Sequence, residues 1–342
     1  MDSHTVHGGY VRQETSWVTI MRGRTQFEIT VQHKRIEATD FGDRYLPKVE
    51  AYNADTLGGL RRLNELLQSI CNHCLPLLEQ FAPQASILGY SLEDLVRSPT
   101  YRLEVVRKGT TRDTRILGVD VCSYTPALNM CPMKTADLPA AYKVISRFHA
   151  EQIMVNVDKH DLLGSVQGRV ETPDGRSLYL KPRESGREKQ FHRELGILND
   201  IKEKHVAKGQ IKLPGLLGIV VVSGESEEEC VGVLINLITA PPFGMDLLSP
   251  GCWARHELHE QWEQQVTATV EELHAHGVVW GDVNAGNVVI DKALDAWVID
   301  FGGMNNPEFL DDDKAETIEG DWQGVRRLFR EWLPSRRAGV PW

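Results

Sequence analysis

Two hydrophobic periodicities alternate along the first third of the chain. Apolar residues occupy every second position over 17–20 and 27–31, on either side of Arg22-Gly23-Arg24, which predicts a β-hairpin. Between Leu57 and Leu78 they recur at every third or fourth position, which predicts one long amphipathic helix. The first part of the chain is therefore expected to combine strands with a helix.

Two more strands are predicted over 101–106 and 116–121, and the basic loop between them is interpreted as a solvated hairpin tip. Together these elements predict an N-terminal α+β domain over 17–125. The residues before it are polar, so a flexible segment is expected over 1–16. Mixed sequence with several prolines then predicts a linker over 126–150.

A different order of elements follows the linker. The turn Pro173-Asp174-Gly175 separates two short strands, and helices are predicted over 186–204 and 256–276. Between these helices lie two apolar strands, over 219–222 and 231–238, joined by an acidic turn. An alternation of Ile153, Val155 and Val157 predicts a further strand before the turn at 173–175. The order is therefore three strands, a helix, two strands and a second helix.

The composition is that of an ordinary globular protein, since 41% of the 342 residues are apolar and 25% are charged. The net charge of −10 disfavours general binding to nucleic acid. No apolar run approaches the ~20 residues that span a bilayer, and no apolar signal segment follows the first residues. We therefore expect a soluble, cytoplasmic protein with neither nucleic-acid nor membrane partners.

Six cysteines are scattered along the chain, and Cys71 and Cys74 have the C-x-x-C spacing of half a zinc site. A structural zinc site needs four ligands, and no second C-x-x-C follows. The neighbours of this pair, including Leu66, Ile70 and Leu78, are apolar and at helical spacing. Both thiols are therefore expected on the buried face of a helix, with a zinc half-site as the open alternative.

The chemistry-bearing residues follow the helix predicted over 256–276. Asp282 and Asn287 form a D-x-x-x-x-N pattern, and Asp300-Phe301-Gly302 comes after it, beyond a predicted strand pair. Asp40-Phe41-Gly42 repeats the tripeptide, but no similar loop precedes it, so it is interpreted as a chance occurrence in a loop. The two later motifs indicate a functional site, because they follow each other at this spacing.

These two motifs resemble the catalytic loop and the D-F-G segment of protein kinases. The resemblance implies that Asp300 and Asn287 are metal ligands that bind Mg²⁺, and with it ATP. It also implies that Asp282 accepts a proton from the acceptor hydroxyl, or orients it, during phosphoryl transfer. ATP and Mg²⁺ are therefore the expected cofactors.

A small kinase-like lobe should supply a lysine and a glutamate that pair with each other. Lys181 ends a predicted strand, is followed unusually by Pro182, and is expected to reach the phosphates of ATP. Its expected partner is Glu194, which lies near the apolar stripe of the next helix, where an unpaired carboxylate is costly. Glu188 is the rival partner. The predicted catalytic residues are therefore Asp282, Lys181 and Glu194.

Two further stretches are expected to contact the nucleotide. The adenine edge would meet backbone groups after the second apolar strand, around Asn236 and Ile238. The segment Gly164-Ser165-Val166-Gln167-Gly168 is the candidate for a phosphate-cradling loop, although it is not a G-x-G-x-x-G. The predicted cofactor site therefore comprises Lys181, Asn236, Ile238, Asn287 and Asp300.

The loop departs from the protein-kinase pattern. Trp280-Gly281 replaces the usual His-Arg, so a phosphorylated loop has no obvious anchor. Asn284 replaces a lysine, as in kinases of the aminoglycoside and choline type. Asp321 begins a helical pattern that resembles the helix whose aspartate braces the catalytic loop. The expected fold is therefore α+β and two-lobed, with a small lobe over 151–240 and a truncated large lobe over 241–342.

The chain resembles the fungal kinase-like protein family in its segments Ser91 to Tyr101 and Thr317 to Gly324. Membership implies a kinase fold but no particular substrate. We therefore predict an ATP- and Mg²⁺-dependent phosphotransferase that acts on a hydroxyl of a protein or a small molecule. Two alternatives stay open. One is a nucleotide-binding scaffold of the pseudokinase type, and the other is an enzyme that uses ATP for adenylyl transfer or for elimination.

Overall fold

The computed structural model describes residues 5–54, 59–83, 90–122, 130–155, 168–204, 206, 211–224, 226–303 and 306–338. The chain is a mixed α+β protein, as the sequence predicts, and it divides into two compact units. The predicted domain limits at 125, 150 and 240 stay predictions.

Within the described residues, no helix has both the length and the apolar character that a membrane span requires. The first unit comprises residues 1–134, 148–176 and 221–231, and the second comprises residues 135–147, 177–220 and 232–342.

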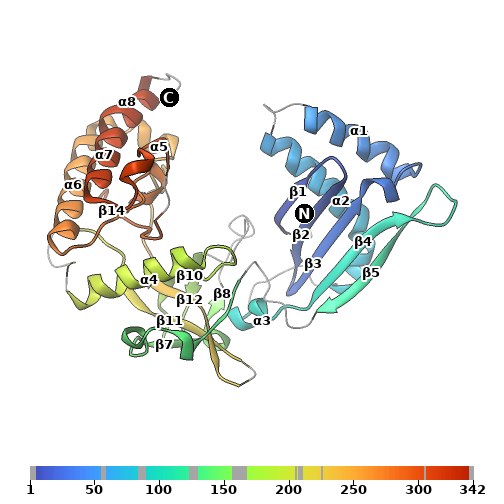
Figure 1. The fold of residues 1–342 in the computed structure, drawn as a ribbon, viewed down its shortest axis with the longest axis horizontal. Coiled ribbons are helices and arrows are strands. Elements are labelled where there is room, and N and C mark those ends of the chain that lie inside the picture. Colours follow the sequence, from blue (N-terminus) through green and yellow to red (C-terminus); the bar gives the residue numbers. More distant parts are fainter. Residues whose placement is uncertain are drawn as a thin grey trace. The chain divides into compact units, whose positions relative to one another are not determined.

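A five-stranded sheet organises the first unit (Figure 1). Its strands lie in chain order, and all neighbours are antiparallel except β3 and β4, which are parallel. The structure differs from the expected flexible segment over 1–16, because residues 5–11 form the edge strand of this sheet. The strands are β1 (Thr5–Val11), β2 (Thr15–Arg22), β3 (Thr25–Gln32), β4 (Thr100–Arg107) and β5 (Thr114–Cys122).

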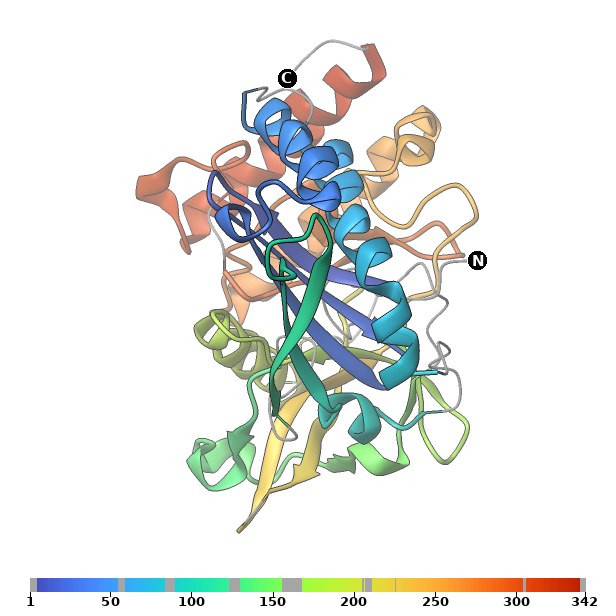
Figure 2. The same ribbon diagram turned by 90° about the vertical axis from the view of Figure 1, so that its right-hand side faces the viewer.

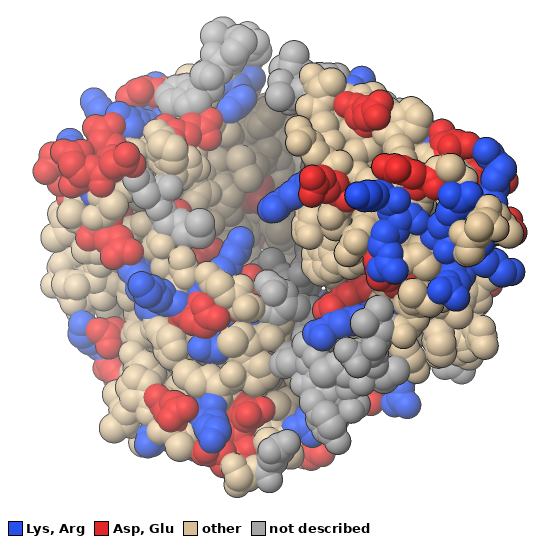
Figure 3. Space-filling view, turned by 45° about the vertical axis from the view of Figure 1, so that its right-hand side comes forward, with Lys and Arg blue, Asp and Glu red and all other residues tan. Residues whose placement is uncertain are grey.

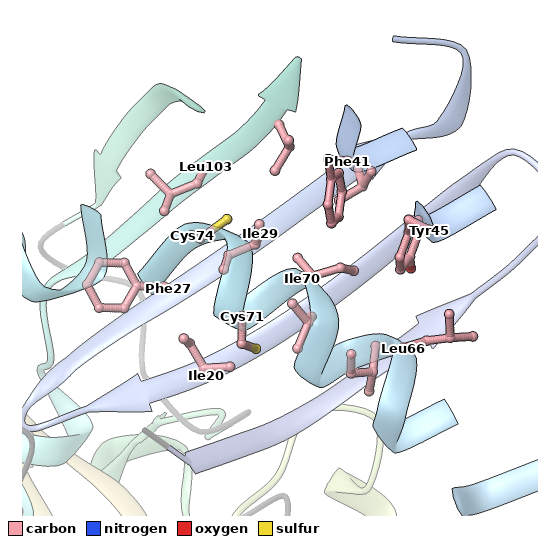
Figure 4. Close-up of a cluster of buried hydrophobic side chains, with 14 of the residues drawn as sticks. Ile20, Phe27, Ile29, Phe41, Tyr45, Leu66, Ile70, Cys71, Cys74 and Leu103 are labelled. Atoms are coloured by element: carbon pink, nitrogen blue, oxygen red, sulfur yellow. The ribbon is translucent and has the colours of Figure 1, made fainter. Parts of the chain in front are cut away.

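Helices α1 (Asp40–Ala54) and α2 (Gly59–Phe81) cover one face of this sheet (Figure 2). The long helix predicted from the apolar spacing is confirmed as α2. Its buried face meets strand residues such as Ile20, Ile29 and Leu103 (Figure 4). Cys71 and Cys74 belong to this cluster, and neither is exposed, so the buried-helix interpretation of the C-x-x-C pair is confirmed.

The first D-F-G tripeptide lies in a helix, and the prediction that it lies in a loop is wrong. Asp40-Phe41-Gly42 forms the first turn of α1. The Thr39 hydroxyl accepts a hydrogen bond from the Gly42 N–H at 2.9 Å, which satisfies one unpaired donor at the start of the helix. Phe41 stacks on His73 of α2, with ring centroids 4.1 Å apart. This tripeptide therefore has a structural role in the first unit.

A capping box at Ser91 begins α3 (Leu92–Val96). The Ser91 hydroxyl accepts a hydrogen bond from the Asp94 N–H, and the Asp94 carboxylate accepts one from the Ser91 N–H. Aspartate therefore serves where glutamate or glutamine is usual in this motif.

Arg112, in the basic loop between β4 and β5, is paired with acidic groups. Figure 3 shows Lys and Arg gathered on the right-hand side of the view, with Asp and Glu beside them. Arg112 contacts both Asp40, at 2.7 Å, and Asp43. On β4, Arg102 lies 3.0 Å from Glu28. These pairs agree with a solvated hairpin tip rather than a ligand site.

A second sheet has the strand order β7-β11-β12-β10-β9-β8, with the short strand β6 paired to β12. Strands β10 and β12 are antiparallel neighbours, and Lys181 pairs with Val233 in their register. The Pro173-Asp174-Gly175 turn lies between β9 and β10, as predicted. The strands are β6 (Met133–Lys134), β7 (Arg147–His149), β8 (Met154–Val155), β9 (Gly168–Glu171), β10 (Ser177–Pro182), β11 (Leu216–Ser223) and β12 (Glu228–Asn236).

The second unit is mainly helical around a small hairpin. Its fully buried side chains include Trp262, Trp280, Phe301 and Trp332. The predicted strand pair before Asp300 is confirmed as the hairpin β13–β14. The helices and strands are α4 (Glu188–Glu203), α5 (Pro250–Trp253), α6 (His259–Ala275), β13 (Val288–Ile290), β14 (Ala296–Val298), α7 (Ile318–Arg327), the π-helical turn η8 (Leu328–Trp332) and α8 (Leu333–Ala338).

The burial of the two thiols of α2 predicts their chemical behaviour. Burial raises the pKa of Cys71 to about 12, and it also raises the pKa of Cys74. Since the thiolate is the reactive form, a rise from 9.0 to about 12 lowers its population about 10³-fold. We expect iodoacetamide to label the α2 peptide slowly in the native protein and rapidly in urea, as followed by mass spectrometry. Fast native labelling, or a lower melting temperature with a zinc chelator, would contradict this prediction.

Candidate functional site

The loop after α6 is fixed first by the indole of Trp280. This side chain is fully buried. Its Nε1–H lies 2.9 Å from the Ile299 carbonyl and 3.2 Å from the Asp300 carbonyl. A single side chain of the first motif therefore holds the backbone of the second motif, although the two are separated by the β13–β14 hairpin.

The carboxylate of Asp321 is the second support of this loop. Its two oxygens accept hydrogen bonds from the Trp280 and Gly281 N–H groups, each at 2.8 Å. His274 Nε2 lies 2.8 Å from the same carboxylate, which is almost completely buried. The backbone at Gly281 has a φ of +76°, which favours glycine. The expectation that an α7 aspartate braces this loop is therefore confirmed as a contact.

Asp282 lies in the loop that these contacts hold, and its side chain is buried. The Asn284 amide donates to the Asp282 carboxylate at 3.1 Å, and the Asn287 amide donates to the Asp282 carbonyl at 2.9 Å. Burial raises the pKa of Asp282 to about 6, and the Asp300 carboxylate adds to the rise. The pKa of Asp282 is therefore closer to neutral pH than that of an ordinary aspartate.

Asp300 is in an unusual backbone conformation, with a φ of +60°. A non-glycine residue in this region costs ~1–3 kcal/mol, and such strain occurs often at functional sites. The Gly302 N–H donates to Asp300 Oδ1 at 3.2 Å, and the buried ring of Phe301 fixes the following residue. This conformation directs the Asp300 carboxylate toward Lys181, whose Nζ lies 3.3 Å away.

Lys181 and Glu194 form the ion pair that the sequence predicts. Lys181 Nζ, at the end of β10, lies 2.6 Å from Glu194 Oε1 on α4, and both side chains are largely buried. Burial lowers the pKa of Lys181, but the Glu194 and Asp300 carboxylates outweigh this effect and raise the pKa. The rival Glu188 instead accepts a hydrogen bond from the Gly186 N–H at 3.1 Å. Lys181 is therefore a cation that two carboxylates hold in place.

The predicted nucleotide edge lies further along the same strand pair. Asn236 is half-buried at the end of β12, opposite Leu178 of β10. Leu178 precedes Lys181 by three residues, which corresponds to ~10 Å along a strand. The Asn236 side chain accepts a hydrogen bond from the Gly215 N–H, and the backbone groups around Asn236 and Ile238 stay candidates for base contacts. Of the candidate phosphate loop, residues 164–167 lie outside the described part of the chain.

Sequence reasoning missed one residue of this region, Arg193 of α4. Its guanidinium donates to the carbonyls of Val279 and Trp280, at 3.2 and 3.1 Å, and to the Phe301 carbonyl. Because these partners are backbone atoms, they leave no signature in residue types. The only signal in the sequence is glycine at position 281, where protein kinases have an arginine.

The residues present fit Mg²⁺ only if phosphate supplies further ligands. Among the described residues, no three His, Cys, Asp or Glu side chains gather as a metal site. Mg²⁺ usually takes one or two carboxylates together with water and substrate phosphates. The half-exposed carboxylate of Asp300 meets this requirement, and the amide oxygen of Asn287 offers a neutral ligand. Asp300 and Asn287 are therefore the residues that could hold Mg²⁺ beside phosphate oxygens.

A separate cavity of about 470 Å³ lies in the first unit. Arg24, Asp94, Arg97 and Glu151 are among the residues that line it. Arg24 and Asp94 approach to 3.5 Å, and Arg97 lies 3.4 Å from Glu93, so both arginines of the cavity are paired with carboxylates. The cavity contains none of the predicted site residues.

Comparisons with known proteins do not assign the chain to a family. It matches no protein-family model, and no curated protein is significantly similar to it. Function is therefore inferred from the geometry of the site itself.

The raised pKa of Asp282 predicts a pH-dependent cost in stability. An unfolded carboxyl titrates near 3.8, so the folded state binds more protons between about pH 4 and 6, and stability falls as pH rises through this window. Above pH 6 the cost reaches ~3 kcal/mol. Without nucleotide, Asp282→Asn should therefore stabilise the protein by ~1–3 kcal/mol at pH 7.5, and by ~2 kcal/mol less at pH 4.5.

Urea unfolding at the two pH values measures this difference. Asp313→Asn, which changes an exposed carboxylate, should alter stability by less than ~0.5 kcal/mol at either pH. A pH-independent effect of Asp282→Asn would show that its carboxyl has an ordinary pKa.

The hydrogen bonds that Asp321 accepts from the loop lead to a second prediction about stability. Asp321→Ala leaves the buried Trp280 and Gly281 N–H groups without an acceptor, and should cost ~3–5 kcal/mol. Glu319→Ala, an exposed change on the same helix, should cost less than ~1 kcal/mol. Urea unfolding of the three proteins compares these costs, and equal values for the two variants would exclude the bracing role.

Proposed function

We propose that the chain is an ATP- and Mg²⁺-dependent phosphotransferase with a two-lobed, kinase-like fold, acting on a hydroxyl acceptor. One observation carries the proposal: Lys181 Nζ lies within 3.3 Å of both Glu194 and Asp300. These three residues come from three separate segments of the chain. An ion pair that served stability alone would not need a third charge from a strained, half-exposed aspartate.

Lys181 would bind the phosphates of ATP, because its ammonium is fixed by Glu194 and is only partly neutralised by Asp300. Asp300 and Asn287 would hold Mg²⁺ against these phosphates, and the ion would neutralise negative charge on the phosphate oxygens. Backbone groups around Asn236 and Ile238 would receive the adenine at the other end of the β10–β12 pair.

Asp282 would orient the acceptor hydroxyl and accept its proton. A pKa of about 6 leaves the carboxylate largely deprotonated at neutral pH, yet makes it a better proton acceptor than an ordinary aspartate. The hydrogen bond from Asn284 fixes the carboxylate oxygen. Phosphoryl transfer depends mainly on such positioning and charge stabilisation, so these few residues are sufficient for the reaction type.

The two motifs and the segment around Thr317 resemble the fungal kinase-like family, and on this basis we propose that the chain is a member of that family and is cytoplasmic. Its acceptor would be a protein or a small molecule. A nucleotide-binding scaffold is the competing function, and the presence of Asp282, Asn287 and Asp300 together favours an enzyme over it.

Two substitutions test the proposal, because one should weaken ATP binding and turnover together and the other should lower turnover alone. Asp300→Asn removes a full charge from the metal–phosphate site, so Mg²⁺-dependent ATP affinity should fall at least ~10-fold, and turnover with it. Asp282→Asn should leave ATP affinity within ~3-fold, while turnover falls ~10²–10⁴-fold. Calorimetric titration with Mg²⁺ and ATP, and γ-phosphate release with a panel of hydroxyl acceptors, provide the two measurements.

Asp313→Asn, on an exposed turn, is the matched charge control and should change neither quantity. Binding of ATP without turnover on any acceptor would favour the scaffold. Full turnover by Asp282→Asn would exclude the proposed mechanism, and absence of ATP binding by the unaltered chain would exclude the whole proposal.

A further inference from the structure

We propose that Arg193 is the positioning residue that keeps this site assembled without phosphorylation of the chain. The inference rests on the proposed phosphotransferase function. Arg193 and Glu194 are consecutive residues of α4, so their side chains leave the helix in directions about 100° apart. One turn of α4 therefore holds Lys181 through Glu194 and the two motif segments through Arg193.

The contacts of Arg193 join three backbone carbonyls from two segments of the chain. Nη1 donates to the Trp280 carbonyl at 3.1 Å and to the Phe301 carbonyl, and Nη2 donates to the Val279 carbonyl at 3.2 Å. Two of these carbonyls precede Asp282, and the third follows Asp300. A guanidinium presents several donors in a fixed plane, whereas a lysine ammonium is a single point of charge. The arrangement therefore requires arginine specifically.

Two glycines shape the backbone around this guanidinium. A Cβ atom at Gly281 would collide with Arg193 Nη2, and one at Gly303 would lie 3.0 Å from both Cδ and Nε of Arg193. Both glycines have positive φ, +76° and +70°. Gly281 occupies the position where the protein-kinase pattern has an arginine. The chain thus has a guanidinium beside this position, supplied by α4 instead of by the loop.

The difference in origin has a regulatory consequence. An arginine in the loop can await an anchoring phosphate, but Arg193 is already occupied by backbone carbonyls, with the Glu316 carboxylate 3.7 Å from Nε. No added phosphate is needed to bring α4, the Asp282 loop and the Asp300 segment together. We infer that the enzyme is active as synthesised and that its activity depends on the geometry that Arg193 maintains.

The test compares Arg193→Lys with Lys202→Ala, an exposed change on the same helix. In the full chain, Arg193→Lys should lower kcat ~10–100-fold with a smaller change in the KM for ATP, because misplacement by about 1 Å costs up to ~10² in rate. Lys202→Ala should match the unaltered protein. Phosphatase treatment of the unaltered protein should leave kcat unchanged.

Chemical rescue separates positioning from general loss of structure. Arg193→Ala should regain activity at least ~5-fold with methylguanidinium but not with methylammonium, which lacks the planar set of donors. Gly281→Ala should reproduce the loss in kcat. Adding it to Arg193→Ala should cost less than it does alone, because its clash partner is then missing and only the strain of the positive φ at this position is added.

Hydrogen exchange provides a readout that does not depend on catalysis. The Trp280, Gly281 and Gly302 amides should exchange ~10-fold faster in Arg193→Lys than in the unaltered protein. Normal kcat and normal exchange in Arg193→Lys, or a lower melting temperature alone, would overturn the inference, as would a phosphatase-sensitive kcat. If the unaltered chain transfers no phosphate, the proposed function fails and this role in activity fails with it. Faster exchange would then identify only a structural clamp.

Discussion

The buried carboxylate of Asp321 is the constraint on which the rest of the site depends. It accepts the Trp280 and Gly281 N–H groups, and thereby fixes the turn from which the Trp280 indole reaches the Asp300 backbone. Asp300 in turn reaches Lys181, which is held by Glu194. A single acceptor on α7 therefore determines the positions of charged groups on a loop, a strand and a helix. Such a chain of contacts tolerates little change at its first member.

Two neighbouring carboxylates, those of Asp282 and Asp300, lie at the end of this series of contacts. Burial raises the pKa of Asp282, the Asp300 carboxylate raises it further, and Lys181 partly compensates for this rise. The protein is thus less stable with these groups than a neutral set of similar shape would make it. Strained backbone and neighbouring carboxylates cost stability, and they occur together often at functional sites.

The sequence predicts a contact of this structure more readily when both partners are side chains than when one partner is a backbone group. The Lys181–Glu194 pair was predictable, because a carboxylate near an apolar stripe needs a cation. Strand β1 was missed because Gly8 and Gly9 interrupt its alternation, and β1 is stabilised by pairing with β2. The contacts of Arg193 were not predictable, since its carbonyl partners have no residue identity and meet only in the folded chain.

The parallel pairing of β3 with β4 has a consequence for how the first unit assembles. Every other neighbouring pair in that sheet is a local hairpin, whereas Gln26 meets Thr100 across 74 positions that include α1 and α2. Hairpins close in microseconds, but a contact across such a length must first overcome a larger loss of chain entropy. The two halves of the sheet therefore form early and join late. The slowest step in building this unit lies at the middle of its sheet rather than at its edges.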